Sequence, residues 1–523
     1  MIGGYIYDKV NSDFEIRLQN NMNQNFNKII AWDNGYLFYN KPFDDDQTSY
    51  LVSNEIIVLS QDLLATVDYD GEYRNFNLQK EFPELFSRIG DEVFNVIKSD
   101  FRMAIVQRTN KNKVLILVSN RAGSARMFFY KMESGVLFAS DLRFLLMIVK
   151  FDINHLGIYS VLKYGAIPEP MTISNNISAV PPAHLVKYDL TSKKYSTSSY
   201  FKFKFDYPDD QNYHDFDHEI LEPIKNTLLK SSKFLNNYEP NILLSGGIDS
   251  SLYGSYLSQT TRRQFQGFYC AFSEDDQELP FAKSIAERIN ADFNVVIMKK
   301  PDAMSILEDV TTLTDHPFSD FSSLPVVFLL RRIREHTTGP TVIIECNGGD
   351  DCFGFADLSN KRKFIFKHYF PKFLKHYISS LVKDFPYWKW ESHEGILARI
   401  SALPDVHEIN LLNYFLVLSP INYLGIDIPQ DWDIKLENAM ETVFTNTGEE
   451  YSKLGYKAKT TIRQLLHVNS RRWAAKALSV GENLGLRIIY PYIWHDVLEE
   501  QGKLPWNAKI FNGIVKWPLK KLL

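Results

Sequence analysis

The sequence predicts a multi-domain α/β protein of the α+β type, in which a β-rich domain precedes a domain built on a parallel sheet. Up to about residue 200, short runs alternate apolar and polar residues, as half-buried strands do. After residue 216, apolar strand-like runs alternate with helical runs. The 523 residues suffice for roughly two to four domains. We expect domains at residues 1–205 and 214–523, with the boundary at 203–216, where Pro and Asp accumulate.

In the first half, three runs are strand candidates and two stretches have helical periodicity. The strand candidates are residues 103–108, 113–119 and 185–190. Helices are expected at 85–98 and at 155–163, and Gly165 and Pro168 should end the second one. This half should therefore form a sheet domain with a few helices.

In the second half, strand and helix candidates alternate along the chain. The strand candidates are residues 241–244, 267–272, 293–298 and 341–344. The helix candidates between them are residues 252–259, 281–289 and 326–335. Such alternation predicts a parallel sheet with helices on both faces. From about residue 360 onwards the pattern is mostly helical.

Composition excludes several classes of protein. A net charge of −5 and a pI near 6.2 argue against nonspecific nucleic-acid binding, which depends on cations that neutralise phosphates. The three cysteines do not form a metal-binding pair or a disulfide framework, so we expect a cytoplasmic protein. The start of the chain does not resemble a secretory signal. Polar residues and a proline interrupt the longest apolar stretch, 411–426, so we expect no membrane span.

The loop from Ser245 to Ser251 is the clearest chemical feature. It follows a strand candidate and precedes a helix, and its two glycines allow a tight turn whose N–H groups can hold a phosphate. Asp249 suits a phosphate site only if Mg²⁺ lies between the carboxylate and the phosphate oxygens, which indicates a metal–nucleotide complex. The pattern of the loop that cleaves at the γ-phosphate is absent from the sequence. The alternative is a Gly-Gly turn followed by a helix cap.

A second loop, Asn347 to Asp351, follows the strand candidate at 341–344. It should therefore lie at the carboxyl edge of the same sheet, where open α/β sheets bind ligands. Its paired acids beside glycines suit a second contact to Mg²⁺. The alternative is a plain turn rich in Asn and Asp.

These motifs resemble the asparagine synthetase superfamily over nearly the full chain. This group includes glutamine-dependent asparagine synthetases, β-lactam synthetases and lasso-peptide cyclases. Ser245-Gly-Gly-Ile-Asp-Ser250 resembles its pyrophosphate-binding SGGxDS loop, and Gly348-Gly-Asp-Asp-Cys-Phe-Gly354 resembles its G-x-D-E-x-F-G segment. Two departures stand out: Asp351 replaces the usual Glu, and Glu345-Cys346 replaces the usual Ser-Gly.

The resemblance implies a fold, a reaction and a site. The fold is an Ntn-hydrolase-like β-sandwich followed by an ATP-pyrophosphatase domain with a helical C-terminal part. In the reaction, a carboxylate attacks the α-phosphate of ATP, pyrophosphate leaves, and an amine then displaces AMP to form an amide. The implied metal ligands are Asp249 and Asp350, and the implied catalytic residues are these two and Lys516. The implied ATP-binding residues are Leu243, Ser245, Gly246, Gly247, Asp249, Ser250, Phe272, Asn347, Gly348 and Gly349.

The first half resembles the amidotransferase domain of the same superfamily, through Arg121-Ala-Gly-Ser-Ala-Arg126 and Tyr164-Gly-Ala-Ile-Pro. Glutamine-hydrolysing members use a cysteine at the mature N-terminus as nucleophile. Ile2 stands there in this sequence, and its alkyl side chain cannot attack glutamine. The domain should therefore be an inactive, structural one.

The end of the sequence departs from the family. The stretch from Lys509 to Lys521 resembles the segment shortly before the loop that carries the catalytic lysine of the family, and the sequence ends at Leu523. Lys516, Lys520 and Lys521 are the cations nearest to the position of that lysine.

Two weaker signals lie outside these motifs. His214 and His218 have the spacing of helical metal ligands, but a third ligand is not close in sequence, so a solvated helix start is the simpler interpretation. Residues Lys361 to Lys383 contain seven Lys or Arg and no acid, interleaved with aromatics. They could receive an acidic, peptide or protein partner, or form a basic amphipathic helix that covers the core.

We therefore expect an ATP-dependent, AMP-forming amide ligase that uses ATP and Mg²⁺. Its substrate would be a small-molecule or peptide carboxylate, and cyclisation of a natural product or peptide is the leading reaction type. One alternative is an ammonia-dependent asparagine synthetase. Another is a non-catalytic scaffold that binds a nucleotide or a partner.

Overall fold

The computed structural model describes residues 1–7, 12–25, 28–32, 35–39, 50–53, 55–61, 64–108, 113–202, 215–261, 263–320, 322–339, 341–354, 429, 431–432, 434–436, 438–439 and 470–523. His214, most of the expected boundary at 203–216, the basic segment 361–383 and the apolar stretch 411–426 lie outside these residues. Within the described part of the chain, no helix has both the length and the apolar character needed to cross a membrane.

Two antiparallel six-stranded sheets form the N-terminal domain. The first has the order β12 (Ile177–Ala179), β10 (Phe128–Met132), β11 (Gly135–Ala139), β1 (Ile2–Tyr7), β3 (Gly35–Tyr39), β2 (Lys28–Trp32). The second has the order β14 (Tyr195–Ser199), β13 (His184–Asp189), β9 (Lys113–Ser119), β8 (Arg102–Arg108), β5 (Ile56–Gln61), β4 (Tyr50–Val52). The three strands expected from alternation are thus confirmed.

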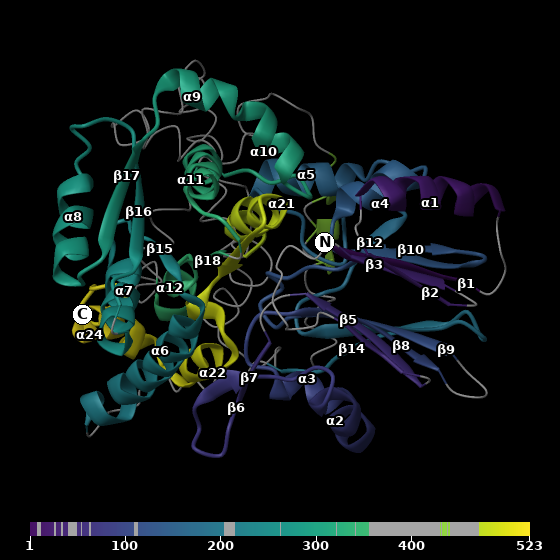
Figure 1. The fold of residues 1–523 in the computed structure, drawn as a ribbon, viewed down its shortest axis with the longest axis horizontal. Helices are drawn as coiled ribbons and strands as arrows, with labels where there is room; N and C mark the ends of the chain where they lie inside the picture. The colour runs from purple at the N-terminus through teal and green to yellow at the C-terminus, as the bar shows by residue number, and fades with distance from the viewer. Residues whose placement is uncertain are drawn as a thin grey trace.

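The two sheets stack as a sandwich, and helices cover both outer faces (Figure 1). Alternation along β1 shows the layering: Ile2 and Ile6 belong to the core between the sheets, whereas Tyr5 and Tyr7 pack in the core on the opposite face. The covering helices of the first sheet are α1 (Ser12–Asn25) and α4 (Leu142–Ile148), and those of the second are α2 (Glu81–Ile89) and α3 (Val93–Val96). The sandwich prediction is therefore confirmed.

The two helices expected in this domain had different outcomes. A single helix over 85–98 is wrong, because Gly90 adopts a positive φ of 57° and a 3₁₀ turn (Gly90–Glu92) separates α2 from α3. The helix expected at 155–163 is confirmed as α5 (His155–Tyr164). Asn154 caps its first turn, and Gly165 ends it in the left-handed region, with φ 77°.

The C-terminal domain contains a five-stranded parallel sheet. Its order is β17 (Asp292–Ile297), β16 (Gln266–Ala271), β15 (Asn241–Leu243), β18 (Thr341–Ile344), β19 (Leu486–Ile489). The four strands expected from sequence are confirmed, and so is the parallel arrangement. Among the described residues after 360, which are mostly helical as expected, β19 adds one strand beside β18.

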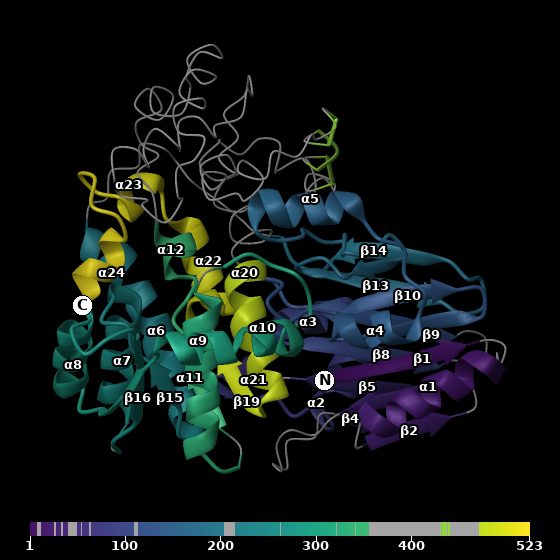
Figure 2. The ribbon, with the colours of Figure 1, turned by 90° about the horizontal axis from the view of Figure 1, so that it is seen from above.

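Helices flank this sheet on both faces, as the alternation predicts (Figure 1). The helices α6 (Glu222–Leu235), α7 (Ile248–Thr260) and α8 (Leu279–Arg288) precede α9 (Lys300–Ser305), α10 (Leu307–Leu313) and α11 (Ser323–His336). After β18 come α12 (Gly349–Phe353), α20 (Ser470–Ala474), α21 (Val480–Asn483), α22 (His495–Lys503), α23 (Trp506–Lys509) and α24 (Trp517–Leu522). In the view from above, α24 lies beside α12 and α7, and it contacts both (Figure 2).

Buried ion pairs join the two domains. Arg471 Nε lies 2.5 Å from Glu169 Oε2, and the side chains are only 1% and 3% exposed. Arg126 Nη2 lies 2.7 Å from Asp315 Oδ1, and both of these side chains are buried. In each pair one partner comes from the sandwich and the other from the parallel-sheet domain. Each of these charges would be costly to bury without its partner, so the contact between the domains depends on both members of each pair.

Candidate active site

The strand order of the parallel sheet defines where a ligand should bind. The chain runs outward from β15 to β16 and β17, then returns to β18 and β19 on the other side of β15. The order reverses between β15 and β18, and open α/β sheets bind ligands at such a switch point, beyond the carboxyl ends of the strands. Both loops singled out in the sequence follow these two strands. The fold therefore places them side by side.

The first loop, from Ser245 to Asp249, is shaped by its glycines. Gly246 has φ 74°, and a Cβ there would lie 2.8 Å from the backbone nitrogen of Ala282. Ser245 Oγ accepts a hydrogen bond from the Gly247 N–H at 3.2 Å and shares another with Ser250 Oγ at 3.1 Å. Helix α7 begins within this stretch, at Ile248, so Asp249 lies in its first turn. The loop thus brings a tight backbone turn, two hydroxyls and a helix N-terminus together, the features that hold a phosphate.

The second loop touches the first through Gly349. A Cβ on Gly349 would lie 2.5 Å from Asp249 Oδ2, so only glycine fits here without displacing that carboxylate. The preceding Gly348 has φ 102°, a conformation that favours glycine. Asp350 follows in the first turn of α12 and is about half exposed. Its carboxylate is therefore accessible to a ligand.

Lys516 joins the two loops. Its Nζ lies 2.8 Å from Asp249 Oδ2 and 2.8 Å from Asp350 Oδ1, although Asp249 and Lys516 are 267 residues apart in sequence. The Lys516 N–H donates to Gly354 O at 3.2 Å, which ties the segment before α24 to the end of α12. Lys520 and Lys521 are exposed on α24. Of the three lysines considered from sequence, the structure thus brings Lys516 to the two acids.

The charges in this cluster affect one another. Burial raises the pKa of Asp249 to about 6, although Lys516 opposes the shift. Burial lowers the pKa of Lys516, but the two carboxylates outweigh it and the net shift is upward, so the lysine stays charged at neutral pH. Asp249 Oδ1 is buried and has no hydrogen-bond partner among the described residues. An acceptor without a donor in this position fits a cation ligand.

These residues fit the predicted Mg²⁺ and ATP. Carboxylate oxygens are the ligands that Mg²⁺ prefers, and Asp249 and Asp350 offer them beside a phosphate-sized turn. Leu243 ends β15 and is half-buried, while Phe272 follows β16 and is 61% exposed. Phe272 could cover a base without rearrangement of the core. The predicted nucleotide residues thus lie on the adjacent loops of β15, β16 and β18.

Three neighbours of the site were not among the predicted site residues. Tyr492 donates from its hydroxyl to the backbone oxygen of Asp249 at 3.0 Å. Glu345 is buried behind the second loop, where it accepts from the Asn347 amide and, at 2.9 Å, from the Tyr490 hydroxyl. The unusual Glu345-Cys346 pair was visible in the sequence, but its inward orientation was not. The tyrosines follow β19, the strand that was not expected.

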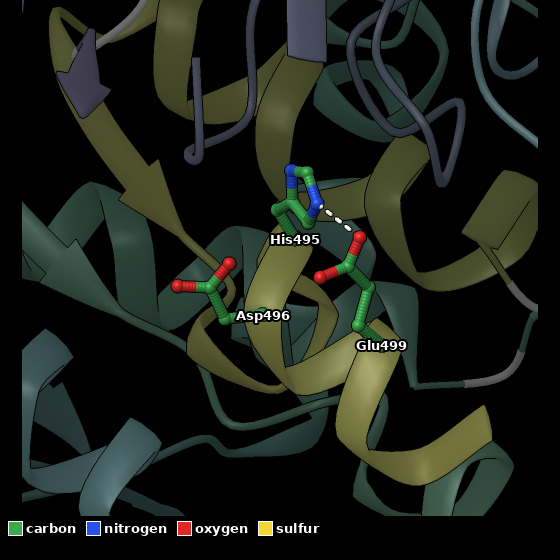
Figure 3. Close-up of side chains that lie close together, drawn as sticks. All are labelled: His495, Asp496 and Glu499. Atoms are coloured by element: carbon green, nitrogen blue, oxygen red, sulfur yellow. Dashed lines mark hydrogen bonds and ion pairs between the residues drawn. The ribbon is translucent and has the colours of Figure 1, made fainter. Parts of the chain in front are cut away.

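A second cluster, His495, Asp496 and Glu499 on α22, has metal-ligand residue types (Figure 3). His495 Nε2 faces Glu499 Oε1 at 2.7 Å, and a carboxylate oxygen of Asp496 lies within 4.8 Å of a ligand atom of each. Two cations of the N-terminal domain already balance the acids: Lys98 Nζ lies 3.3 Å from Asp496, and Arg121 Nη1 lies 3.7 Å from Glu499. We assign this cluster to the domain junction. Of the two histidines noted from sequence, His218 is exposed and His214 lies outside the described residues.

Comparison with known proteins places these features in a family. A glutamine amidotransferase domain model matches residues 81–201. An asparagine synthase model matches residues 236–523, more than half of the chain. The chain belongs to the asparagine synthase family. The predicted superfamily is thereby confirmed.

Individual relatives are distant. A Methanocaldococcus jannaschii protein that bears the name of a glutamine-hydrolyzing asparagine synthetase is 24% identical over 353 residues, which make up 62% of this chain and 66% of the relative. This chain therefore spans just under two thirds of that relative's length.

Solved structures show weaker likenesses. Glutamine phosphoribosylpyrophosphate amidotransferase from B. subtilis has a TM-score of 0.25 at 9% identity, covering 66% of this chain and 74% of that one. NH3-dependent NAD synthetase from Campylobacter jejuni has a TM-score of 0.21 at 12% identity, covering 45% of this chain and 97% of that one.

Proposed function

We propose that this protein is an AMP-forming amide ligase that activates a substrate carboxylate with ATP and couples it to an amine. The observation that carries the proposal is the convergence of Asp249, Asp350 and Lys516 at the switch point of the sheet. Family membership supports the ATP-dependent amidation. The AMP-forming chemistry and the choice of substrate belong to the proposal.

The proposed reaction has two steps. A carboxylate oxygen of the substrate attacks the α-phosphorus of ATP, the bond to the bridging oxygen breaks, and pyrophosphate leaves. The amine nitrogen then attacks the acyl carbon, loses a proton and displaces AMP. Negative charge develops mainly on the departing pyrophosphate in the first step, so preorganised positive groups there lower the barrier.

This chain has the groups that the first step needs. The Ser245–Asp249 loop would hold the pyrophosphate through its backbone and hydroxyls, and Lys516 would add a positive charge. Asp249 and Asp350 would hold Mg²⁺, which supplies further charge neutralisation when bound. Burial of Asp249 strengthens all these interactions because it lowers the local dielectric.

The amine should come from a source other than glutamine hydrolysed by this chain. Ile2 lies in β1 with its side chain buried between the two sheets, and its backbone N–H donates to Ser140 Oγ at 3.0 Å. An alkyl group cannot act as a nucleophile. We therefore propose that the sandwich domain is structural and that the amine belongs to the substrate itself, as in a cyclisation of a natural product or peptide.

The test is a substrate screen that follows pyrophosphate release from Mg²⁺-ATP with purified protein, L-aspartate and a panel of peptide carboxylates. Asp249→Asn and Asp350→Asn keep the side-chain size and remove one charge, so each should abolish release while circular dichroism stays unchanged. A matched control is Asp189→Asn, because Asp189 accepts from the Thr191 and Ser192 N–H groups in the turn between β13 and β14 of the sandwich domain. Wild-type turnover in both site variants would show that the loops do not hold the metal–nucleotide complex.

Ammonia-dependent asparagine synthesis is the second candidate, favoured by the name of the archaeal relative. Aspartate with ammonium would then support pyrophosphate release, and asparagine would accumulate. A non-catalytic scaffold is less well supported, because the three charged residues of the site are all present and paired.

The basic segment from Lys361 to Lys383 lies outside the described residues, and its role as a docking surface for an acidic peptide stays a proposal. Exposed charges attract more weakly when salt shortens the Debye length below about 8 Å. The variant Lys367→Gln with Lys372→Gln and Lys375→Gln should then raise KM for a peptide substrate and reduce the salt dependence. Unchanged KM values would favour the core-covering helix.

A further inference from the structure

The ammonium group of Lys516 contacts both acids that would hold the metal. Its Nζ is 2.8 Å from an oxygen of each acid proposed to hold Mg²⁺, and the Lys516 and Asp249 side chains are only 14% and 15% exposed. An ammonium and a divalent cation in contact with the same two oxygens would repel each other strongly at such low exposure. The lysine and the metal therefore compete for one position.

We propose that Lys516 is a resident cation that holds Asp249 and Asp350 in the ligand-free protein and leaves them when a metal–nucleotide complex binds. The first part of this proposal, that Lys516 holds the two acids in the ligand-free protein, rests only on the contacts described above. The displacement by nucleotide rests on the proposed function, because it requires phosphates at the neighbouring loop.

Charge balance supports this exchange. Two carboxylates and one ammonium together carry −1, whereas the two carboxylates alone carry −2, and affinity for a divalent cation rises with the charge of its ligands. A free metal ion must therefore displace an internal cation before it binds well.

Nucleotide phosphates change this balance because they offer the lysine a new anionic partner. The lysine stem is flexible, and the Asp350 side chain is about half exposed, so a ligand can approach the pair from the solvent. Metal and nucleotide should consequently bind with positive coupling: each raises the affinity for the other. Mg²⁺ would enter this site together with ATP rather than before it.

The experiment measures Mn²⁺ binding to the full chain, without nucleotide, by electron paramagnetic resonance of the free ion. Lys516→Gln keeps a long polar side chain but removes the charge, and it should bind Mn²⁺ at least about tenfold more tightly than wild type because the ligand set gains a net negative charge. Lys516→Arg keeps the charge and should match wild type. Lys520→Gln, which removes an exposed charge from the same helix, should also match wild type.

A Lys516→Gln protein that binds Mn²⁺ no more tightly than Lys516→Arg would overturn the proposal. If Lys516→Gln does not fold, Mn²⁺ binding to the wild-type protein with and without nucleotide provides the test. Its Mn²⁺ affinity should rise when an ATP analogue with a non-cleavable α–β bridge is added, after correction for the Mn²⁺–analogue complex in solution. Equal affinity with and without the analogue would refute the exchange. Failure of every carboxylate in the substrate screen would refute the proposed function but leave the nucleotide-free Mn²⁺ result standing.

Discussion

Replacement of Arg471 by methionine should destabilise the protein far more than loss of an exposed ion pair. Arg471 contacts Glu169 at 2.5 Å, and its Nη1 donates to Gly123 O at 2.8 Å. Removal of one member of a buried pair leaves an uncompensated charge, which costs about 3–5 kcal/mol. Loss of an exposed pair costs about 0.2–1 kcal/mol. The junction variant should therefore lose several times more stability than a surface variant.

The cost should also depend on pH in a defined direction. Burial raises the pKa of Glu169, and Arg471 opposes that rise. Without Arg471 the pKa of Glu169 rises further above its unfolded value, so the folded state of the variant takes up a proton more readily. Its stability deficit should shrink as pH falls and grow as pH rises through the folded pKa.

Urea unfolding followed by tryptophan fluorescence at several pH values provides the measurement, since Trp473 lies on the same helix as Arg471. The matched control is Arg332→Met, which removes an exposed pair with Glu335. The double variant Arg471→Met with Glu169→Leu should recover part of the loss, because it removes both charges. If Arg471→Met cost less than about 1 kcal/mol, as expected of an exposed pair, the buried pair would not hold the domains as described.

Three further predictions follow from the site and the junction. Affinity for a Mg²⁺–nucleotide complex should fall as pH drops through about 6, because the Asp249 carboxylate must be ionised to bind the metal. Titration with a fluorescent ATP analogue between pH 5 and 8 measures this affinity. An affinity that does not change with pH would contradict the prediction. Burial lowers the pKa of His495 from 6.5 to about 4, in a setting that also contains Lys98, Arg121 and Glu499. Between these two pKa values the unfolded state therefore binds more protons than the folded state. The free energy of unfolding should drop by up to about 3 kcal/mol as pH falls from 7 to 4. His495→Gln should reduce this dependence of stability on pH. Purified protein should release no glutamate from glutamine above an uncatalysed control, because Ile2 has no nucleophilic atom.

Sequence reasoning reached the sheets and the two loops because their signals are local. Alternation identifies strands within six or seven residues, and the glycine turns after β15 and β18 have recognisable patterns. Helix α1 was missed, although Phe14, Leu18 and Met22 are spaced four apart and pack into one core. Its many asparagines and glutamines obscured that spacing, since they contribute little to a hydrophobic pattern.

Other features depend on contacts that no local pattern contains. Strand β19 has only four residues, and its extended form is fixed by pairing with β18. The expected helix over 85–98 required Gly90 to stay helical, whereas burial of Phe82 and Phe94 in one core bends the chain there. The pairing of Lys516 with Asp249 joins segments that only the completed sheet brings together. The sequence named Lys516 with Lys520 and Lys521 as nearby alternatives, and of these three the structure brings Lys516 to the acids.

The long separation between Asp249 and Lys516 has a consequence during synthesis. At about 5–20 residues per second, the ribosome needs roughly 13–53 s to add the 267 residues between them. Through that interval the nascent chain has the loop after β15 without the cation that balances its buried carboxylate. The same holds for Glu169, whose partner Arg471 is made 302 residues later. Both domains should therefore acquire their final stability only after the last segments emerge, so a chain interrupted before residue 471 should be an easy substrate for proteases.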